Sequence, residues 1–446
     1  MKNSKIKSIT LFSLALLILS LLVSCSEPHQ HEFGEWITDT EANCTDSGTK
    51  KRSCECGAIE TEPVSAMGHN FLDGVCERCK KGASEGLEFY SNGDGTCSFI
   101  GRGSCADADI IIPAKSPNGD TVTKIMSGGF FADDLLATIY VPESVLEITT
   151  DGLSASSNFA SISVSPNNTV YASLDGVLYT KDFKTLIKYP TAKSGASFDI
   201  PESVTAIGFG AFANATNLTS VGIPEGVQKI ETSAFMSCSA LTSITIPDGV
   251  TTISGGAFAN CRALLTVNLP ESITSIEENA FGYCEALTSF TVPSGVTTIP
   301  KYAFSNCKSL ADIKLHDKIT TIGPSAFYYC SALKEINVPA SVTRIYERAF
   351  ASCASLESAI IPDGVKTIYA GTFQLCSSLV SITIPESVTK IEDSAFYECR
   401  ALSSIIFKGT VAQWESVKTI GSWRAFAPAK EITCADGAVK FSFSYS

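Results

Sequence analysis

The sequence predicts a mainly β fold with short helical turns, in which coils of 23 residues stack into a solenoid. Three recurring residues support this period. Prolines are separated by 23 residues or a multiple of it, at Pro201, Pro224, Pro247, Pro270, Pro293, Pro339, Pro362 and Pro385. Phenylalanine fills one slot in nine successive repeats, at Phe212, Phe235, Phe258, Phe281, Phe304, Phe327, Phe350, Phe373 and Phe396. Cysteine fills another slot in eight, at Cys238, Cys261, Cys284, Cys307, Cys330, Cys353, Cys376 and Cys399.

One repeat reads L-x-x-I-x-I-P-x-x-V-x-x-I-x-x-x-A-F-x-x-C-x-x. The I-x-I segment predicts a short strand with two inward side chains, which ends at the proline because proline has no N–H for a strand ladder. V-x-x-I predicts a second short extended segment, and A-F-x-x-C-x-x-L has the spacing of one helical turn. A single repeat is too small to bury these residues, so we expect the repeats to share one continuous core.

The repeat resembles the BspA-type, or treponemal-type, leucine-rich repeat of bacterial surface proteins over residues 85–430. SNGDGTCSFIGRGSCADADIIIP resembles the N-terminal cap of that family, and a segment near residues 163–190 resembles its β-hairpin insertion. FKGTVAQWESVKTIGSW resembles its terminal coil, so we expect Trp414 and Trp423 to cover the last hydrophobic layer and residues 431–446 to form a C-terminal cap. The resemblance implies adhesion to host matrix proteins or other cells, and it carries no catalytic residues.

The eight cysteines lie on the same inward line as the phenylalanines. Successive side chains in such a stack are about 5 Å apart and point in parallel, so neither a disulfide nor a metal site suits them. We expect a ladder of structural thiols, in which each cysteine is a small buried side chain whose S–H group donates to a turn carbonyl. The first full coil has Ala215 in this slot, which a packing role tolerates.

Residues 1–25 are predicted to be a lipoprotein signal peptide. Three lysines precede an apolar run over residues 9–23, which is too short for a comfortable membrane span. The run ends in Leu22-Val23-Ser24-Cys25, which resembles the bacterial lipobox. The resemblance implies that Cys25 carries acyl chains, which would anchor the protein in the bacterial cell envelope with its repeats exposed at the surface. An ordinary secretory signal with an incidental cysteine is the alternative.

Residues 26–84 hold five cysteines and three of the four histidines, and they are poor in apolar side chains. A segment this short usually needs a metal or disulfides. The pair Cys76 and Cys79 has the spacing of a zinc knuckle, and Cys54 and Cys56 form an upstream pair that is one residue shorter. These four, with His31 or His69 as a possible replacement for a weak ligand, predict one structural zinc ion in a zinc-ribbon-like module. The module also resembles a short Cys/His unit of secreted bacterial surface proteins, and a pair of disulfides is the alternative.

Charge and motifs exclude several classes of function. The net charge of −13 disfavours nucleic acid as a partner. His316, the one histidine in the repeats, occupies a proline slot at the end of a strand, where we expect a packing role rather than a catalytic one. The sequence contains no P-loop or dinucleotide-binding motif. We therefore expect no enzymatic activity.

The remaining candidate site is the outward side of the first strand in each repeat, at the positions four and two residues before the proline slot. A parallel sheet presents these positions as two polar rows. The predicted protein-binding face comprises Asn268, Thr291, Asp312, Lys314, Glu335 and Asn337. A solvated face that mainly keeps the sheet soluble is the alternative.

These observations together predict a cell-surface lipoprotein adhesin that binds proteins of a host or a neighbouring cell. The second possibility is a surface glycan-binding protein that feeds a transport system. Sugar sites usually stack rings on aromatic side chains, and the predicted face offers few of them.

Overall fold

The computed structural model describes residues 32–42, 48–55, 57–64, 71–72, 75–77, 79–130, 133–149, 152–153 and 157–441. The chain forms two compact units with their boundary between Gly82 and Ala83. In the first unit an antiparallel sheet has the order β1-β2-β3, and two further short strands, β4 and β5, pair antiparallel. These strands are Ile37–Thr40 (β1), Gly48–Ser53 (β2), Ile59–Val64 (β3), Phe71–Leu72 (β4) and Val75–Cys76 (β5).

The second unit begins with an irregular cap that has its own hydrophobic core. One sheet has the order β11-β9-β7-β6 and another the order β12-β10-β8. Their strands are Glu88–Ser91 (β6), Thr96–Gly101 (β7), Asp109–Ile111 (β8), Thr121–Ile125 (β9), Thr138–Val141 (β10), Glu147–Ile148 (β11) and Ser161–Val164 (β12). Phe99 and Phe130 stack between these sheets and loops with ring centroids 4.9 Å apart.

A three-stranded meander follows the cap, within the segment that resembles a hairpin insertion. It consists of Tyr171–Leu174 (β13), Val177–Thr180 (β14) and Thr185–Lys188 (β15), which pair antiparallel. Asp175 and Gly176 join the first two strands with φ values of 49° and 76°, as a two-residue hairpin loop requires. β15 then pairs parallel with β17 (Ala206–Ile207), a strand of the first coil, so the meander continues into the array.

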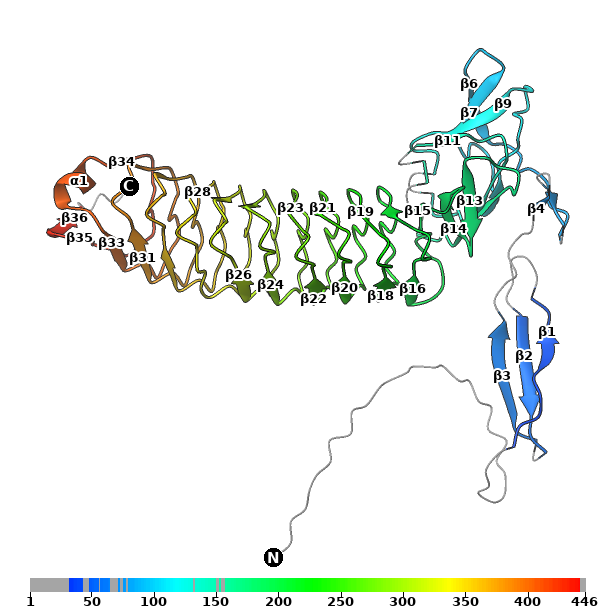
Figure 1. Cartoon of the computed structure of the whole chain (residues 1–446), viewed down its shortest axis with the longest axis horizontal. Helices are drawn as coiled ribbons and strands as arrows, with labels where there is room; N and C mark the ends of the chain where they lie inside the picture. Colours follow the sequence, from blue (N-terminus) through cyan, green and yellow to red (C-terminus); the bar gives the residue numbers. More distant parts are fainter. Residues whose placement is uncertain are drawn as a thin grey trace, which may run out of the picture. The chain divides into compact units, whose positions relative to one another are not determined.

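The coils of the array contribute strands to two parallel rows, which run along opposite edges of the stack in Figure 1. Most coils supply one strand to each row, and the coil of Glu335 and Asn337 has a regular strand in the second row alone. The first row comprises β16 (Ser197–Asp199), β18 (Ser220–Gly222), β20 (Ser243–Thr245), β22 (Thr266–Asn268), β24 (Ser289–Thr291), β26 (Asp312–Lys314), β29 (Ser358–Ile360), β31 (Ser381–Ile384), β33 (Ser404–Phe407) and β35 (Glu431–Cys434). The second row comprises β17 (Ala206–Ile207), β19 (Lys229–Ile230), β21 (Thr252–Ile253), β23 (Ser275–Ile276), β25 (Thr298–Ile299), β27 (Thr321–Ile322), β28 (Arg344–Ile345), β30 (Thr367–Ile368), β32 (Lys390–Ile391) and β34 (Lys418–Thr419). The predicted mainly β solenoid is therefore confirmed.

A stack of phenylalanine rings forms the centre of the array. The nine rings from Phe212 to Phe396 follow one another with centroids 4.9–5.6 Å apart, and each is at most 2% exposed. Tyr189 stacks on Phe212 at one end, and Trp423 meets Phe396 edge-on at the other. With the repeated Leu, Ile, Val, Ala and Cys side chains, the rings form one continuous core.

The stretch around each phenylalanine forms consecutive tight turns instead of the predicted helical turn. Every coil has two residues with positive φ here, such as Gly256 (59°) and Asn260 (62°), and an α-helix cannot contain them. The N–H groups of Gly256, Phe258 and Asn260 donate to carbonyls of the next coil at 2.7–2.9 Å. The intervening N–H groups of Ala257, Ala259 and Cys261 donate within the coil to carbonyls three residues earlier, at 3.0–3.2 Å. The stretch therefore alternates bonds to the next coil with bonds inside its own turns, which the helical spacing of its apolar residues does not reveal.

The last coil closes the core. Thr410 caps the short helix α1 (Val411–Glu415), whose Trp414 is 7% exposed. Trp423 is 8% exposed and lies 6.2 Å from Trp414 between ring centroids, so both tryptophans cover the final layer. β35 then pairs antiparallel with β36 (Gly437–Lys440), the last strand in the described part of the chain.

Candidate functional site

The first strand row presents two lines of exposed side chains. In β20, β24 and β26 the middle residue is buried and the two flanking residues are exposed. Neighbouring strands pair parallel, so that Ser289 lies beside Asp312 and Thr291 beside Lys314. The register therefore aligns the outer residues of successive coils on one face.

The predicted face residues all lie exposed on this row. Thr291, Asp312 and Lys314 occupy regular strands, and Asn268 donates from Nδ2 to Oγ1 of Thr245 at 3.1 Å. Glu335 and Asn337 lie outside a regular strand but keep the alternation, with Ile336 buried between them. In the described part of the chain Asp312 and Lys314 form no ion pair, so their charges remain available to a partner.

Two exposed apolar residues of this row were not among the predicted face residues. Ile360 in β29 is 63% exposed and pairs in register with Thr383. Ile406 in β33 is 40% exposed on the same line. Both stand two residues before the proline slot of their coil, which Pro362 and Lys408 occupy. The other coils carry mostly polar residues at this position, so comparison of the repeats could have revealed them. We define the central patch as Asp312, Lys314, Glu335, Asn337 and Ile360.

The eight ladder cysteines are at most 1% exposed, and none of them forms a disulfide. Each Sγ donates to the carbonyl of the phenylalanine in the preceding coil, as from Cys307 to Phe281 at 3.2 Å. The same bond recurs at 3.0–3.2 Å for the other seven. These thiols have packing and hydrogen-bonding contacts, and they line no accessible site.

Burial suppresses the ionisation of these thiols. Desolvation raises the pKa of Cys238, Cys353 and Cys399 to about 12. It raises the pKa of the other five well above the ordinary range for the same reason. Since the thiolate is the reactive and metal-binding form, the ladder is chemically inert in the folded protein.

The Cys/His segment provides tight turns at both cysteine pairs. The N–H of Gly57 donates to the carbonyl of Cys54 at 2.9 Å, and the N–H of Lys80 donates to that of Cys76 at 2.8 Å. Cys54 is half-buried, Cys76 buried and Cys79 exposed. Within the described ranges, no three His, Cys, Asp or Glu side chains come together as a metal site. The turns suit a zinc knuckle, and the zinc ion stays a prediction.

Several predicted residues lie outside the described residues: Cys25, His31, Cys56 and His69. Zinc ligation by the last three and acylation of Cys25 therefore stay predictions. Across the residues that the structure does describe, no helix has the length and apolar character that crossing a bilayer demands.

His316 has both ring nitrogens in hydrogen bonds with the backbone. Nδ1 accepts from the N–H of Lys318 at 3.2 Å, so Nε2 carries the proton and donates to the carbonyl of Pro293 at 2.9 Å. The imidazole thus links two neighbouring coils at the proline slot. It has no nucleophile or carboxylate among these partners, in agreement with a packing role.

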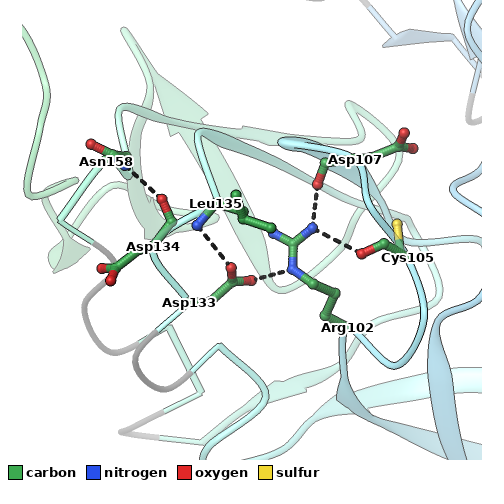
Figure 2. Close-up of polar contacts among 7 residues, drawn as sticks. All are labelled: Arg102, Cys105, Asp107, Asp133, Asp134, Leu135 and Asn158. Atoms are coloured by element: carbon green, nitrogen blue, oxygen red, sulfur yellow. Dashed lines mark hydrogen bonds and ion pairs between the residues drawn. The ribbon is translucent and has the colours of Figure 1, made fainter.

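In the cap, Arg102 joins two loops (Figure 2). Its Nε donates to Oδ2 of Asp133 at 2.7 Å, and its Nη1 donates to the carbonyls of Cys105 and Asp107. The two side chains are only 14% and 11% exposed. This largely buried ion pair fixes the loops of the cap, and its polar atoms face protein rather than an open pocket.

Comparison with known proteins identifies the repeat. The profile of the BspA type leucine rich repeat region matches residues 191–311 and 297–418, which together make up just over half of the chain. A search of curated proteins found no match.

Solved structures of three bacterial proteins are similar to the chain. A leucine-rich repeat protein from Eubacterium ventriosum has 31% identity and a TM-score of 0.45, and the match covers 50% of this chain and 60% of that protein. A leucine rich cell surface protein from Faecalibacterium prausnitzii has 28% identity and a TM-score of 0.45, with 75% and 97% covered. A leucine-rich repeat protein from Bacteroides ovatus has 21% identity and a TM-score of 0.34, with 78% and 98% covered.

Proposed function

The chain belongs to the BspA-type leucine-rich repeat family, and from that premise we propose that it is a surface-exposed envelope protein that binds another protein through its first strand row. The partner is a protein of a host or of a neighbouring cell. The chain acts as an adhesin without catalysis, since the described residues offer an aligned face rather than a nucleophile with its base.

The central patch is the observation that carries this proposal. Ile360 exposes 63% of its surface on a strand face, and exposure of an apolar side chain to water is unfavourable. Lys314 and Asn337 precede it on the same line, and Asp312 and Glu335 add charge on the neighbouring line. An apolar residue within a polar and charged rim is the usual composition of a protein interface.

Binding to a panel of host matrix proteins, measured by surface plasmon resonance with the full chain, tests the proposal. Ile360→Glu and Lys314→Glu should each weaken binding about tenfold or more, as loss of an interface anchor does. Lys229→Glu is the matched control, because Lys229 is an exposed lysine of β19 in the second row. Equal losses in all three variants, or none in the first two, would contradict the proposed face.

The alternative of a glycan receptor receives no support from this row. Its outward positions from Ser220 to Ile406 are all described, and none of them holds an aromatic residue. A glycan array measured beside the protein panel separates the two functions. Binding to glycans alone, with loss in Ile360→Glu, would favour the alternative.

We also propose that acyl chains on Cys25 anchor the protein. The lipobox-like sequence supports this, because two acyl chains suffice for stable membrane attachment. Cys25→Ser should release the protein into the aqueous fraction or leave the precursor uncleaved. Mass spectrometry that finds an unmodified N-terminus downstream of Cys25 would exclude the anchor.

We further propose that residues 26–84 bind one zinc ion. The tight turns at Cys54 and Cys76 support this, because such turns can direct two thiolates toward one metal. Metal analysis of the full chain should find about one zinc per protein, and Cys76→Ser should remove it. Disulfides in this segment without zinc would establish the alternative.

A further inference from the structure

A hollow of about 280 Å³ opens on the turn side of the array, the side formed by the tight turns between each second-row strand and the following cysteine. Its lining includes three small buried residues, Ser325, Ala351 and Ser352. The larger side chains of the lining are Tyr302, Tyr328, Arg348, Gln374 and Leu375, and those of Tyr302, Arg348 and Leu375 are exposed at the rim. Its volume is close to the lower end for small-molecule sites, which suits a unit such as one sugar residue.

Two rim residues occupy backbone positions that normally exclude them. The residue two positions before each stacked phenylalanine has positive φ in nine successive coils, which hold Gly210, Ser233, Gly256, Asn279, Tyr302, Ser325, Arg348, Gly371 and Ser394. Seven of these nine are Gly, Ser or Asn, and the two exceptions, Tyr302 (φ 57°) and Arg348 (φ 53°), both line the hollow. A bulky residue in the left-handed region costs free energy and commonly marks a functional site.

The neighbouring coils leave room for these side chains. Ser325 separates Tyr302 from Arg348 in the column, so both flank a small residue. In the next coil Gly371 replaces a side chain, and an added Cβ there would lie 3.1 Å from Cγ of Arg348 and 3.0 Å from Oε1 of Gln374. Glycine at this position thus allows Arg348 and Gln374 to lie together at the rim.

The polar groups of the hollow favour a ligand with a carboxylate. Arg348 forms no ion pair in the described part of the chain, and no carboxylate is among the lining residues. Lys301 places a second cation nearby, with Nζ 5.0 Å from the ring centroid of Tyr302. In a chain of net charge −13, a hollow with an unpaired guanidinium selects for an anion.

We propose that this hollow binds a carboxylate-bearing sugar residue, which Arg348 recognises through its carboxylate and Tyr302 through its ring. The side chains of Ser325 and Gln374 supply hydrogen-bonding groups for the sugar hydroxyls. Arginine pairs with a planar carboxylate through two N–H groups, and tyrosine combines an apolar ring face with a polar hydroxyl. The site is separate from the strand face proposed for protein binding and does not depend on it.

Isothermal titration calorimetry of the full chain tests this site with three probes. Sialyllactose and trigalacturonic acid both carry a carboxylate, and lactose is the neutral control. The wild-type chain should bind at least one acidic probe more tightly than lactose by about tenfold or more. Binding of sialyllactose would identify a sialic acid as the ligand, and binding of trigalacturonic acid would identify a uronic acid.

Variants locate the binding. Arg348→Gln should weaken binding of the acidic probe about tenfold or more, and Arg344→Gln, the same change at an exposed arginine of β28, should leave it unchanged. Tyr302→Asn should abolish binding, whereas Tyr283→Asn, at another exposed tyrosine with positive φ, should not. Asparagine favours this backbone conformation, so Tyr302→Asn should unfold at the same temperature as the wild type or a higher one.

The stability measurement separates a binding role from a structural one. Loss of binding with unchanged or raised thermal stability supports the site. Absence of binding to both acidic probes would overturn it, and so would equal affinity for lactose or unchanged binding in Arg348→Gln.

Discussion

In the array, each coil repeats the same contacts, whereas in the cap each contact is made once. The phenylalanine stack and the thiol ladder each use one residue type in coil after coil, with nearly constant ring spacings and S–H bonds. In the cap, Asn168 is 1% exposed and alone donates to the carbonyls of Pro142 and Val145 while it accepts from the N–H groups of Val170 and Tyr171. Stability in the array is therefore shared among neighbours, and in the cap it depends on single residues.

The array and the cap should therefore be destabilised by different kinds of change. A change that affects all coils alike should act mainly on the array, because its effect is multiplied by the number of coils. A change at one polar residue should act most strongly in the cap, where no neighbouring copy makes the same contact.

Alkaline pH should have the largest effect, and it should act on the array. The folded pKa of the ladder thiols is raised by burial, to about 12 at Cys238, Cys353 and Cys399, whereas an unfolded thiol ionises near about 8.5. Stabilisation by the neutral thiols is complete below about pH 8.5 and is lost as pH rises toward the folded pKa, because only the unfolded chain releases these protons. Each thiol should contribute about 1.4 kcal/mol of loss per pH unit in this window.

Hydrogen exchange at about pH 8 and about pH 10, corrected for its intrinsic pH dependence, measures this loss by region. Peptides of the array should lose more protection than peptides of the cap, which has two cysteines, Cys97 and Cys105, against the eight of the ladder. Cys307→Ala should reduce the pH dependence of the array. Equal losses in the two regions would contradict the role of the ladder.

Arg102→Ala should have the next largest effect, confined to the cap. Removing one partner of a largely buried ion pair commonly costs about 3–5 kcal/mol, because Asp133 would keep a poorly solvated charge. Lys124→Ala is the matched control, since its ion pair with Glu147 is more exposed and should cost less than about 1 kcal/mol. Urea denaturation with hydrogen exchange of the cap compares the two, and similar costs would show that the Arg102 pair does not stabilise the cap.

Cys307→Ser should have a smaller effect, centred on one coil. The more polar hydroxyl enters a slot shaped for sulfur, at a cost of about 1–3 kcal/mol. Cys307→Ala should cost a similar amount or less, through a small cavity and the loss of the bond to the Phe281 carbonyl. Thermal unfolding of both variants tests this, and a loss of metal from either would show that Cys307 is a ligand.

Repetition also explains how far the sequence could predict the molecule. The period placed the two strand segments, the phenylalanines and the outward positions of the strand face, because each occurs many times. The helical turn predicted at A-F-x-x-C was wrong, because the spacing of apolar residues alone cannot distinguish a helix from turns that bond to the next coil. The recurrence of Gly, Ser and Asn at positions such as Gly256 and Asn260 was the available signal for positive φ.

Features that occur once lay beyond the pattern. The Arg102 and Asn168 contacts join segments that are distant in sequence, and no repeat marks them. Ile360 and the pair Tyr302 and Arg348 are departures from the repeat consensus, so they could be found only by asking which coils differ. In a repeat protein the consensus predicts the scaffold, and the exceptions are the first candidates for function.

The most direct test of the account is the state of each ladder thiol, because the register that buries them also sets the strand face and the hollow. Differential alkylation with mass spectrometry, on the full chain without reductant, measures each cysteine separately before and after unfolding. We predict that all eight ladder thiols are unreactive in the folded chain and become free and fully alkylated when it unfolds. Ladder cysteines joined in disulfides, or readily alkylated in the folded chain, would contradict the register and both proposed sites.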